Sequence, residues 1–270
     1  MNKSHQLFDL SGKTILITGA NGWLASGFVE PLLSYGASVL LLDSSPAVEK
    51  TAKEFSKKYS GRAQSVRVDM FNKSQYAKTL QGIAKKQKIY GIINNAFCFG
   101  KSNVETGAEG DFMSLSDEQW MTAFESGILW AVQTVKPFLP AMRKHKSGSI
   151  LNLCSMYSLI APNPDLYAGE FKKYLSQPTY TSVKHGLWGW TKYMSSFLAA
   201  DGVRCNAIAP GAFSKTSTDP KFIKRLEATI PLKRIGSPRD LAGAVVYLMS
   251  DSSAYTTGQC LAVDGGWTVR

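Results

Sequence analysis

The sequence lacks the segments that place a chain in or across a membrane. It contains no run of about 18 or more apolar residues, which a membrane-spanning helix needs. The amino-terminal stretch MNKSHQLFDLSGK has neither the apolar central region nor the small-residue cleavage site of a secretory signal peptide. We therefore expect a cytoplasmic protein that has no membrane partner.

Cysteine is scarce and widely spaced. The four cysteines, Cys98, Cys154, Cys205 and Cys260, form no CxxC pair. Zinc sites and disulfide frameworks depend on closer, paired spacings. We expect reduced thiols, buried where they lie in apolar runs, and no metal site.

Acidic residues are also in the minority, with 20 Asp and Glu against 31 Lys and Arg. Much of the basic excess lies between Lys50 and Tyr90, spread along two helical patterns, which is typical of a solvated outer face. Aromatic and basic residues do not alternate there as they do in surfaces that stack bases. We expect no nucleic-acid partner.

What the sequence does contain is a regular alternation of short apolar runs and longer helical patterns. The runs are nearly continuous, as in strands that are covered on both faces. They are 14–18, 38–43, 65–69, 91–95, 149–153, 204–209 and 261–264, and the helical patterns are 47–59, 74–86, 116–143, 180–200 and 239–249. This order predicts an α/β fold: one Rossmann-type, doubly wound parallel sheet with helices on both faces, in a single domain over residues 1–270.

Two long segments, 157–178 and 212–231, interrupt this alternation. Both would leave the carboxyl ends of strands, where open α/β sheets bind ligands. Structureless segments of this length in a compact domain are usually functional. We expect both to be substrate-binding loops.

The stretch TGANGWLAS, Thr18 to Ser26, follows the first strand and precedes a helix. Gly19 and Gly22 permit the tight turn and the close approach of backbone N–H groups to a pyrophosphate, as in dinucleotide-binding loops. Ala25 stands where such loops carry their last glycine, and it adds only a methyl group. The setting of strand, turn and helix favours a working loop.

Asp43 ends the second strand, about twenty residues after the loop, where dinucleotide-binding folds place an acidic residue. Its carboxylate can accept the ribose hydroxyls of NAD and would repel the extra phosphate of NADP. Neither Arg nor Lys lies beside it in LLDSSPAV. The sequence therefore predicts NAD, with NADP less favoured; the alternative role of Asp43 is to cap the next helix.

Tyr180 and Lys184 are four residues apart in YTSVK, on one face of a predicted helix. Together with TGANGWLA, NNA, LNLCS, NAIAPG and GQCLAVDGGW, in this order, they make the chain resemble the short-chain dehydrogenase/reductase family over nearly its whole length. The resemblance implies hydride transfer between a nicotinamide and an alcohol or ketone. It implies that Tyr180 is the acid/base, that Lys184 lowers the pKa of Tyr180 and holds the nicotinamide ribose, and that Ser155 bonds the reacting oxygen.

The resemblance also implies which residues bind the cofactor. Asp69 and Asn95 would line the adenine side, and the residues after NAIA would flank the nicotinamide. The complete expected set is Gly19, Asn21, Gly22, Trp23, Leu24, Asp43, Asp69, Met70, Asn95, Ala96, Tyr180, Lys184, Pro210, Gly211 and Phe213.

Two departures from the family pattern bear on catalysis. Phe97 stands where the family's NNAG ends in glycine. Gly127, counted from Trp120, stands where the family has an Asn that supports a water in a proton relay to the lysine. The missing Asn keeps open the alternative of a non-catalytic NAD-binding homologue. The glycine spacing of TGANGWLA favours a second alternative, an epimerase or dehydratase that uses bound NAD transiently.

The substrate is suggested by an unusually long interval between Ser155 and Tyr180. Tyrosines and lysines in this interval (Tyr157, Tyr167, Tyr174, Lys172 and Lys173) suit a polar, sugar-like substrate. The sequence around this interval resembles family members associated with bacterial surface-sugar synthesis, including nonulosonic acids. The resemblance further implies a homodimer or homotetramer packed through the helices 116–143 and 180–200.

Overall fold

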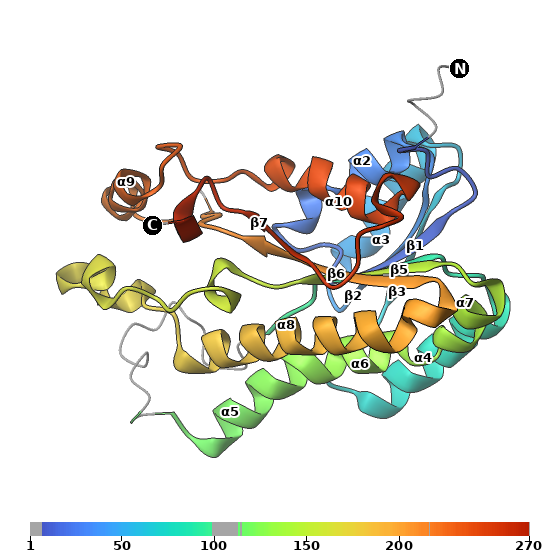
Figure 1. The fold of residues 1–270 in the computed structure, drawn as a ribbon, viewed down its shortest axis with the longest axis horizontal. Coiled ribbons are helices and arrows are strands. Elements are labelled where there is room, and N and C mark those ends of the chain that lie inside the picture. Colours follow the sequence, from blue (N-terminus) through green and yellow to red (C-terminus); the bar gives the residue numbers. More distant parts are fainter. Residues whose placement is uncertain (1–6, 99–112, 114, 216, 270) are drawn as a thin grey trace.

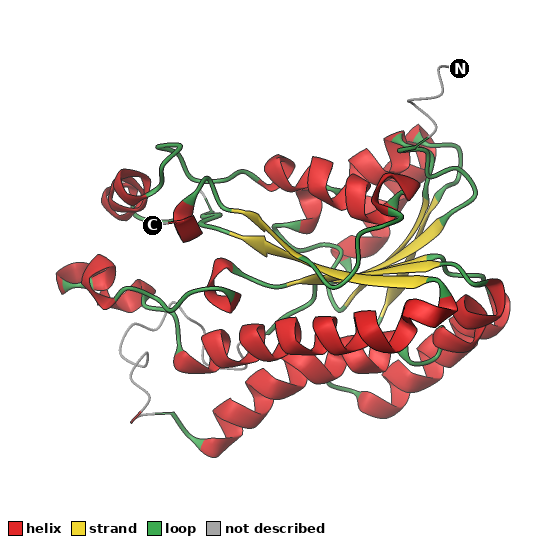
Figure 2. Ribbon diagram, in the orientation of Figure 1, coloured by secondary structure: helices red, strands yellow, loops and turns green. Residues whose placement is uncertain are grey.

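The computed structural model describes residues 7–98, 113, 115–215 and 217–269. Seven strands form one parallel sheet in the order β3-β2-β1-β4-β5-β6-β7 (Figures 1 and 2). They are β1 (Thr14–Thr18), β2 (Ser38–Asp43), β3 (Ala63–Arg67), β4 (Gly91–Asn94), β5 (Gly148–Leu153), β6 (Val203–Pro210) and β7 (Cys260–Val263). The predicted Rossmann-type sheet is confirmed, and β3 begins and ends two residues earlier than expected.

Helices cover both faces of the sheet (Figure 2). One face carries α2 (Val29–Ser34), α3 (Ala47–Lys58) and α10 (Ala242–Met249), and the other carries α4 (Lys73–Lys86), α6 (Trp130–Val135), α7 (Leu139–His145) and α8 (Pro178–Leu198). Successive strand side chains point to opposite faces, so Ile15 and Ile17 join the first core and Leu16 joins the second. This double burial explains the continuous apolar runs.

The prediction of one continuous helix over residues 116–143 is wrong. It consists of α5 (Asp117–Phe124), a π-helical turn η3 (Glu125–Leu129), α6 and, after a break at Pro137, α7. Proline lacks the amide hydrogen that would continue the helical ladder. The π-helical turn matters for the site, because such turns carry one extra residue and often lie at functional positions.

The two segments predicted as loops contain helices. Residues after β5 form the short 3-10 helices η4 (Met156–Ser158), η5 (Pro164–Tyr167) and η6 (Gly169–Tyr174), and residues after β6 include α9 (Pro220–Thr229). The side chain of Asp219 accepts a bond from the Lys221 N–H, and Pro220 occupies the first turn, so these residues start a helix. Figure 1 shows η5, η6 and α9 gathered at one end of the molecule.

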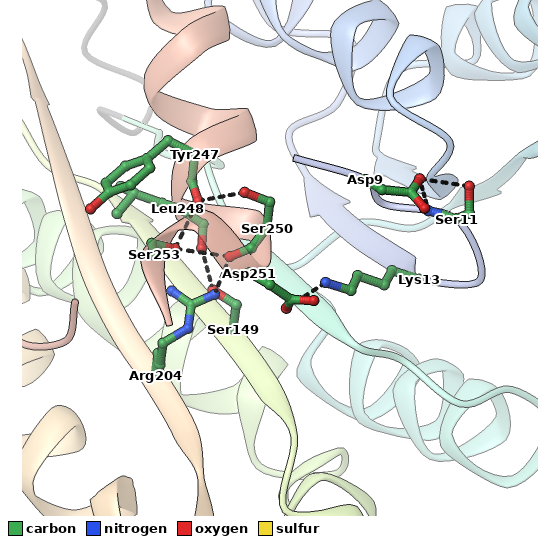
Figure 3. Close-up of polar contacts among 10 residues, drawn as sticks. All are labelled: Asp9, Ser11, Lys13, Ser149, Arg204, Tyr247, Leu248, Ser250, Asp251 and Ser253. Carbon is green, nitrogen blue, oxygen red and sulfur yellow. Dashed lines mark hydrogen bonds and ion pairs between the residues drawn. The ribbon is translucent and has the colours of Figure 1, made fainter. Parts of the chain in front are cut away.

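Polar contacts join the amino-terminal edge of the sheet to the residues around the end of α10 (Figure 3). Ser149 Oγ donates to the Leu248 carbonyl at 2.7 Å, and Arg204 Nη2 donates to the Ser250 carbonyl at 3.1 Å. Lys13, just before β1, pairs with Asp251 at 2.7 Å. Among the described residues, no helix is long and apolar enough to cross a membrane.

Candidate active site

The glycine loop after β1 is held by the end of β4. Gly19 has a φ of +61°, and a Cβ atom there would lie 2.9 Å from Ala96 Cα. Asn95 Nδ2 donates to the carbonyls of Thr18 at 3.2 Å and Gly19 at 2.8 Å. A side chain at position 19 is therefore excluded both by backbone conformation and by space.

Ala25 does not disturb this loop. It is fully buried in the 3-10 helix η1 (Ala25–Gly27), so its methyl group is accommodated in the core. The tightest approach occurs two residues later, because a Cβ atom on Gly27 would overlap the Pro238 carbonyl of η8 (Pro238–Leu241). The close packing expected of the loop's last glycine is thus supplied by Gly27.

Asp43 lies beside the loop at the carboxyl end of β2. Its Oδ2 accepts a bond from the Asn21 N–H and its Oδ1 accepts one from the Ser45 N–H, both at 2.9 Å. The register of β2 and β3 also places Arg67 opposite Asp43, and Arg67 Nε donates to the Ser44 carbonyl at 3.2 Å. Sequence reasoning missed this cation because strand register cannot be read from the local sequence LLDSSPAV.

Tyr180 and Lys184 lie one turn apart on α8; Tyr180 is half-buried and Lys184 is buried. Lys184 is 5% exposed and its Nζ donates to the Leu153 carbonyl at 2.7 Å. Burial lowers the pKa of Lys184 to about 8. The lysine side chain is therefore fixed to the last residue of β5.

Burial raises the pKa of Tyr180, and a hydrogen bond with Ser155 opposes that rise. The pKa of Tyr180 is therefore raised, not lowered as expected, because desolvation dominates and the opposing contribution comes from Ser155. Ser155 is itself held in place: its Oγ accepts a bond from the Tyr157 N–H and its N–H donates to Ser158 Oγ, both at 3.2 Å. Ser155 and Tyr180 thus form a fixed pair between η4 and α8.

A cavity of about 530 Å³ runs from the glycine loop to Lys184. Eleven of the predicted cofactor-binding residues line it: Gly19, Gly22, Trp23, Leu24, Asp43, Asp69, Met70, Asn95, Ala96, Tyr180 and Lys184. Asn21 contributes through its bond to Asp43. Phe97, Trp130 and Cys154 also line the cavity and were not in the predicted set.

The predicted residues after β6 lie elsewhere. Pro210 ends β6, and a Cβ atom on Gly211 would meet Asp264 at 2.6 Å, so Gly211 packs against the residues that follow β7. Phe213 lines a separate hollow with Arg234 and Gly236. In this structure Phe213 does not line the cavity that contains Gly19 and Lys184.

The helices after β5 rest on α9. Tyr157 and Tyr167 share a hydrogen bond between their hydroxyl groups, and both side chains are buried. Tyr174 stacks on Phe222 of α9 at 4.4 Å between ring centroids. Tyr174 therefore serves packing, whereas Tyr157 and Tyr167 bring hydroxyl groups toward Tyr180, whose charge affects the pKa of Tyr157. Lys172 is exposed on η6.

Comparison with known proteins decides the family. A family model described as enoyl-(acyl carrier protein) reductase matches residues 20–268. The chain belongs to the short-chain dehydrogenase/reductase family. It is an oxidoreductase of this type, and its relatives include dehydrogenases of sugar acids.

Two curated members of the short-chain dehydrogenase/reductase family illustrate the similarity. The oxidoreductase YgcW of Escherichia coli K12, described as uncharacterized, is 29% identical over 99% of this chain and 97% of its own. The 2-dehydro-3-deoxy-D-gluconate 5-dehydrogenase of Bacillus subtilis is 28% identical over the full length of both chains.

Solved structures of the family include both nicotinamide cofactors. A candidate NAD(P)-dependent gluconate 5-dehydrogenase from Beutenbergia cavernae, with bound NADP, has 28% identity and a TM-score of 0.84 over 98% of this chain and 100% of its own. A short-chain dehydrogenase from Leptospira borgpetersenii with bound NAD+ has 26% identity and a TM-score of 0.81 over 99% of this chain and 96% of its own. The choice between NAD and NADP is therefore not decided by these relatives.

Proposed function

We propose that this short-chain dehydrogenase/reductase oxidises a secondary alcohol, or reduces the matching ketone, on a sugar-acid substrate. The observation that carries the proposal is the arrangement of the cavity. A glycine loop with an acidic strand end lines one side, Tyr180 and Lys184 line the other, and Ser155 bonds Tyr180 from outside the lining. Cofactor binding and proton transfer can therefore occur within one cavity.

The cavity suits a dinucleotide because its residues meet different parts of the cofactor. Gly19 and Gly22 leave backbone close to a pyrophosphate, Asp43 offers carboxylate oxygens to a ribose, and Lys184 offers an ammonium to the second ribose. When bound, the nicotinamide supplies or accepts the hydride.

Tyr180 is the proposed acid/base for the substrate hydroxyl. In the oxidation direction its phenolate oxygen takes the hydroxyl proton, and in the reduction direction its hydroxyl returns it. Ser155, bonded to Tyr180, would donate to the reacting oxygen and fix its position. Lys184 stabilises the phenolate by its positive charge.

The pKa of Lys184 gives this proposal a pH dependence. Because it is lowered to about 8, the ammonium charge is present near neutrality and is lost as the pH rises through that value. Loss of the charge removes the stabilisation of the Tyr180 phenolate. Because Tyr180, whose pKa is raised, must act as the phenolate, we expect turnover in the oxidation direction to rise with pH and to level off above about pH 8, where the Lys184 charge is lost. Turnover of a Lys184→Arg variant should keep rising above that pH, measured at saturating cofactor.

We propose NAD as the preferred cofactor, on the strength of the Asp43 carboxylate beside the loop. Arg67 is the observation that favours NADP, since its guanidinium lies next to Asp43 and could pair with a 2′-phosphate. Calorimetric titration with NADH and, separately, NADPH tests this directly. Tighter binding of NADPH would overturn the proposed preference.

A sugar acid is proposed as substrate because of the relatives. The Bacillus subtilis relative is named for a deoxygluconate, and the Beutenbergia cavernae neighbour for gluconate. Tyr157 and Tyr167, whose hydroxyl groups bond each other, are buried behind Tyr180 and do not line the cavity of Gly19 and Lys184. The earlier expectation of a nonulosonic acid remains a second candidate within the same chemical class.

The decisive experiment is turnover on a panel of sugar acids with both cofactors. The panel contains D-gluconate, 2-dehydro-3-deoxy-D-gluconate, a nonulosonic acid and the simple polyol sorbitol as a neutral control. We expect a sugar acid to be oxidised or its keto form reduced. Tight cofactor binding without turnover of any member in either direction would favour the non-catalytic alternative.

We also propose a homodimer or homotetramer formed through α8 and its neighbours. Tyr193 and Phe197 are 63% and 49% exposed on α8 and stack on each other, and Leu129 of η3 is 45% exposed. Sedimentation of the wild type and of Phe197→Glu tests this assembly. A wild-type monomer would contradict it.

A further inference from the structure

Phe97 occupies a specific place between the end of β4 and helix α8. Its ring meets the Tyr180 ring edge-to-face, with centroids 5.3 Å apart and planes at 72°. The Lys184 ammonium lies 4.9 Å from the centroid of the same ring. The ring therefore contacts both ionisable groups of the proposed acid/base pair.

The absence of a side chain at Gly127 leaves no empty space. A Cβ atom there would lie 2.7 Å from the Val183 side chain and 3.4 Å from Phe97 Cε2. Gly127 belongs to the π-helical turn η3, and the neighbouring Ser126 hydroxyl donates to the Cys98 carbonyl at 2.6 Å. The residues after β4 are thus fixed against η3, and the Phe97 ring extends toward Gly127.

Few other groups offset the loss of solvation of the buried Lys184 ammonium. Its one hydrogen bond in the described part of the chain goes to the Leu153 carbonyl. No carboxylate of the described residues lies within 4.0 Å of it. The faces of the Phe97 and Tyr180 rings lie 4.9 and 5.6 Å from it, and the nearby Cys154 thiol favours its charged form. A desolvated cation over an aromatic face is stabilised by the ring quadrupole.

We propose that Phe97 is a positioning residue that holds the Lys184 ammonium in its charged form, and that Gly127, whose Cβ atom would meet Val183 and touch the Phe97 ring, leaves both side chains in place. The family pattern has glycine and asparagine at these two positions, so the two departures act as one coupled change. Phe97 acts on the reaction through Lys184 and Tyr180. This inference rests on the proposed function for its catalytic meaning, while the charge of Lys184 can be measured independently.

The ionisable groups around Lys184 stay the same in the test variants. Tyr180 lies on its own helix, Cys154 follows β5, and Cys260 of β7 contacts Cys154. Glu125 of η3 pairs with Lys73. Changes at Phe97 therefore alter the aromatic face without adding or removing a charge.

The experiment titrates Lys184 directly, by NMR of protein labelled at lysine Cε, with the resonance assigned by its loss in Lys184→Met. Phe97→Leu keeps apolar bulk and removes the ring, Phe97→Tyr keeps the ring, and Phe55→Leu, in α3 on the opposite face of the sheet, is the control. We expect a midpoint near 8 in the wild type. It should fall by about 0.5 to 1 pH unit in Phe97→Leu and by less than about 0.3 in the other two.

An unchanged or higher midpoint in Phe97→Leu overturns the inference. If Phe97→Leu does not fold, as judged by circular dichroism, Phe97→Met is measured with the same expectation. The pH at which turnover levels off should move with the midpoint, whereas a purely packing role would lower turnover at every pH alike. A shifted midpoint in a protein with no turnover would leave the inference standing and reject the proposed function.

Discussion

The two edges of the sheet differ in how their polar groups are used. At the amino-terminal edge, Ser149 and Arg204 are buried and donate hydrogen bonds to backbone carbonyls at the end of α10 (Figure 3). Their polar groups are thus used within the protein itself. At the carboxyl edge, Asp43, Tyr180 and Lys184 face a cavity of about 530 Å³. One edge is built for stability and the other for binding a ligand, and substitutions at the two edges should separate these effects.

The largest effect on function is expected for Tyr180→Phe. Removal of the phenolic hydroxyl takes away the proton donor and acceptor, which contributes about 10²–10⁴-fold to such reactions. We expect turnover to fall by that factor while the NADH dissociation constant and the melting temperature change little. Stopped-flow turnover, calorimetry and a thermal melt measure the three quantities, and near-normal turnover would reject Tyr180 as the acid/base.

A loss of stability without a gain of activity is expected for Gly127→Asn. The Cβ atom of the new side chain would lie 2.7 Å from Val183, with the Phe97 ring also in contact, and overpacking of this kind costs about 1–3 kcal/mol. We therefore expect this variant to be less stable in urea and no more active than the wild type. The double variant with Phe97→Gly should regain part of the stability. An equal loss of stability in the single and the double variant would show that the Phe97 ring does not limit the space at position 127.

Cofactor preference should respond to Asp43. Asp43→Ser removes the charge that repels a 2′-phosphate and leaves Arg67 beside the site. We expect the ratio of NADPH to NADH affinity to rise about 10- to 100-fold, a change of about 1.4–2.7 kcal/mol. Arg67→Gln in the Asp43→Ser background should reverse most of the gain. A ratio unchanged by Asp43→Ser would remove Asp43 as the selecting residue.

The smallest effect on function is expected at the amino-terminal edge. Ser149→Ala leaves the Leu248 carbonyl without its buried donor, at a cost of about 1–3 kcal/mol in unfolding free energy. Cofactor affinity should not change, because Ser149 is at the opposite end of β5 from Leu153. A changed cofactor affinity with normal stability would contradict the division between the two edges.

The sequence was sufficient for features that are local. The strand at Thr14–Thr18, the glycine turn and the spacing of Tyr180 and Lys184 each depend on neighbouring residues, and the structure places them as expected. Arg67 could not be foreseen, because its position beside Asp43 depends on the register of two strands.

Two further features depend on contacts across the fold. Helix α9 was predicted as part of a loop, because its apolar pattern is short and its residue Phe222 is buried against Phe171, which lies far away in the sequence. The relation between Phe97 and Gly127 needs the packing of β4 against η3. Each position appeared in the sequence only as an isolated departure from a family pattern.

The aromatic cluster between η5, η6 and α9 limits how this enzyme's specificity can be transplanted. Tyr167, Phe171 and Tyr174 all pack on the single ring of Phe222. The segment after β5 would lose its support in a recipient that lacks this ring. A chimaera that is to keep the substrate range must therefore receive residues 156–174 and α9 together, although two separate stretches of the gene encode them.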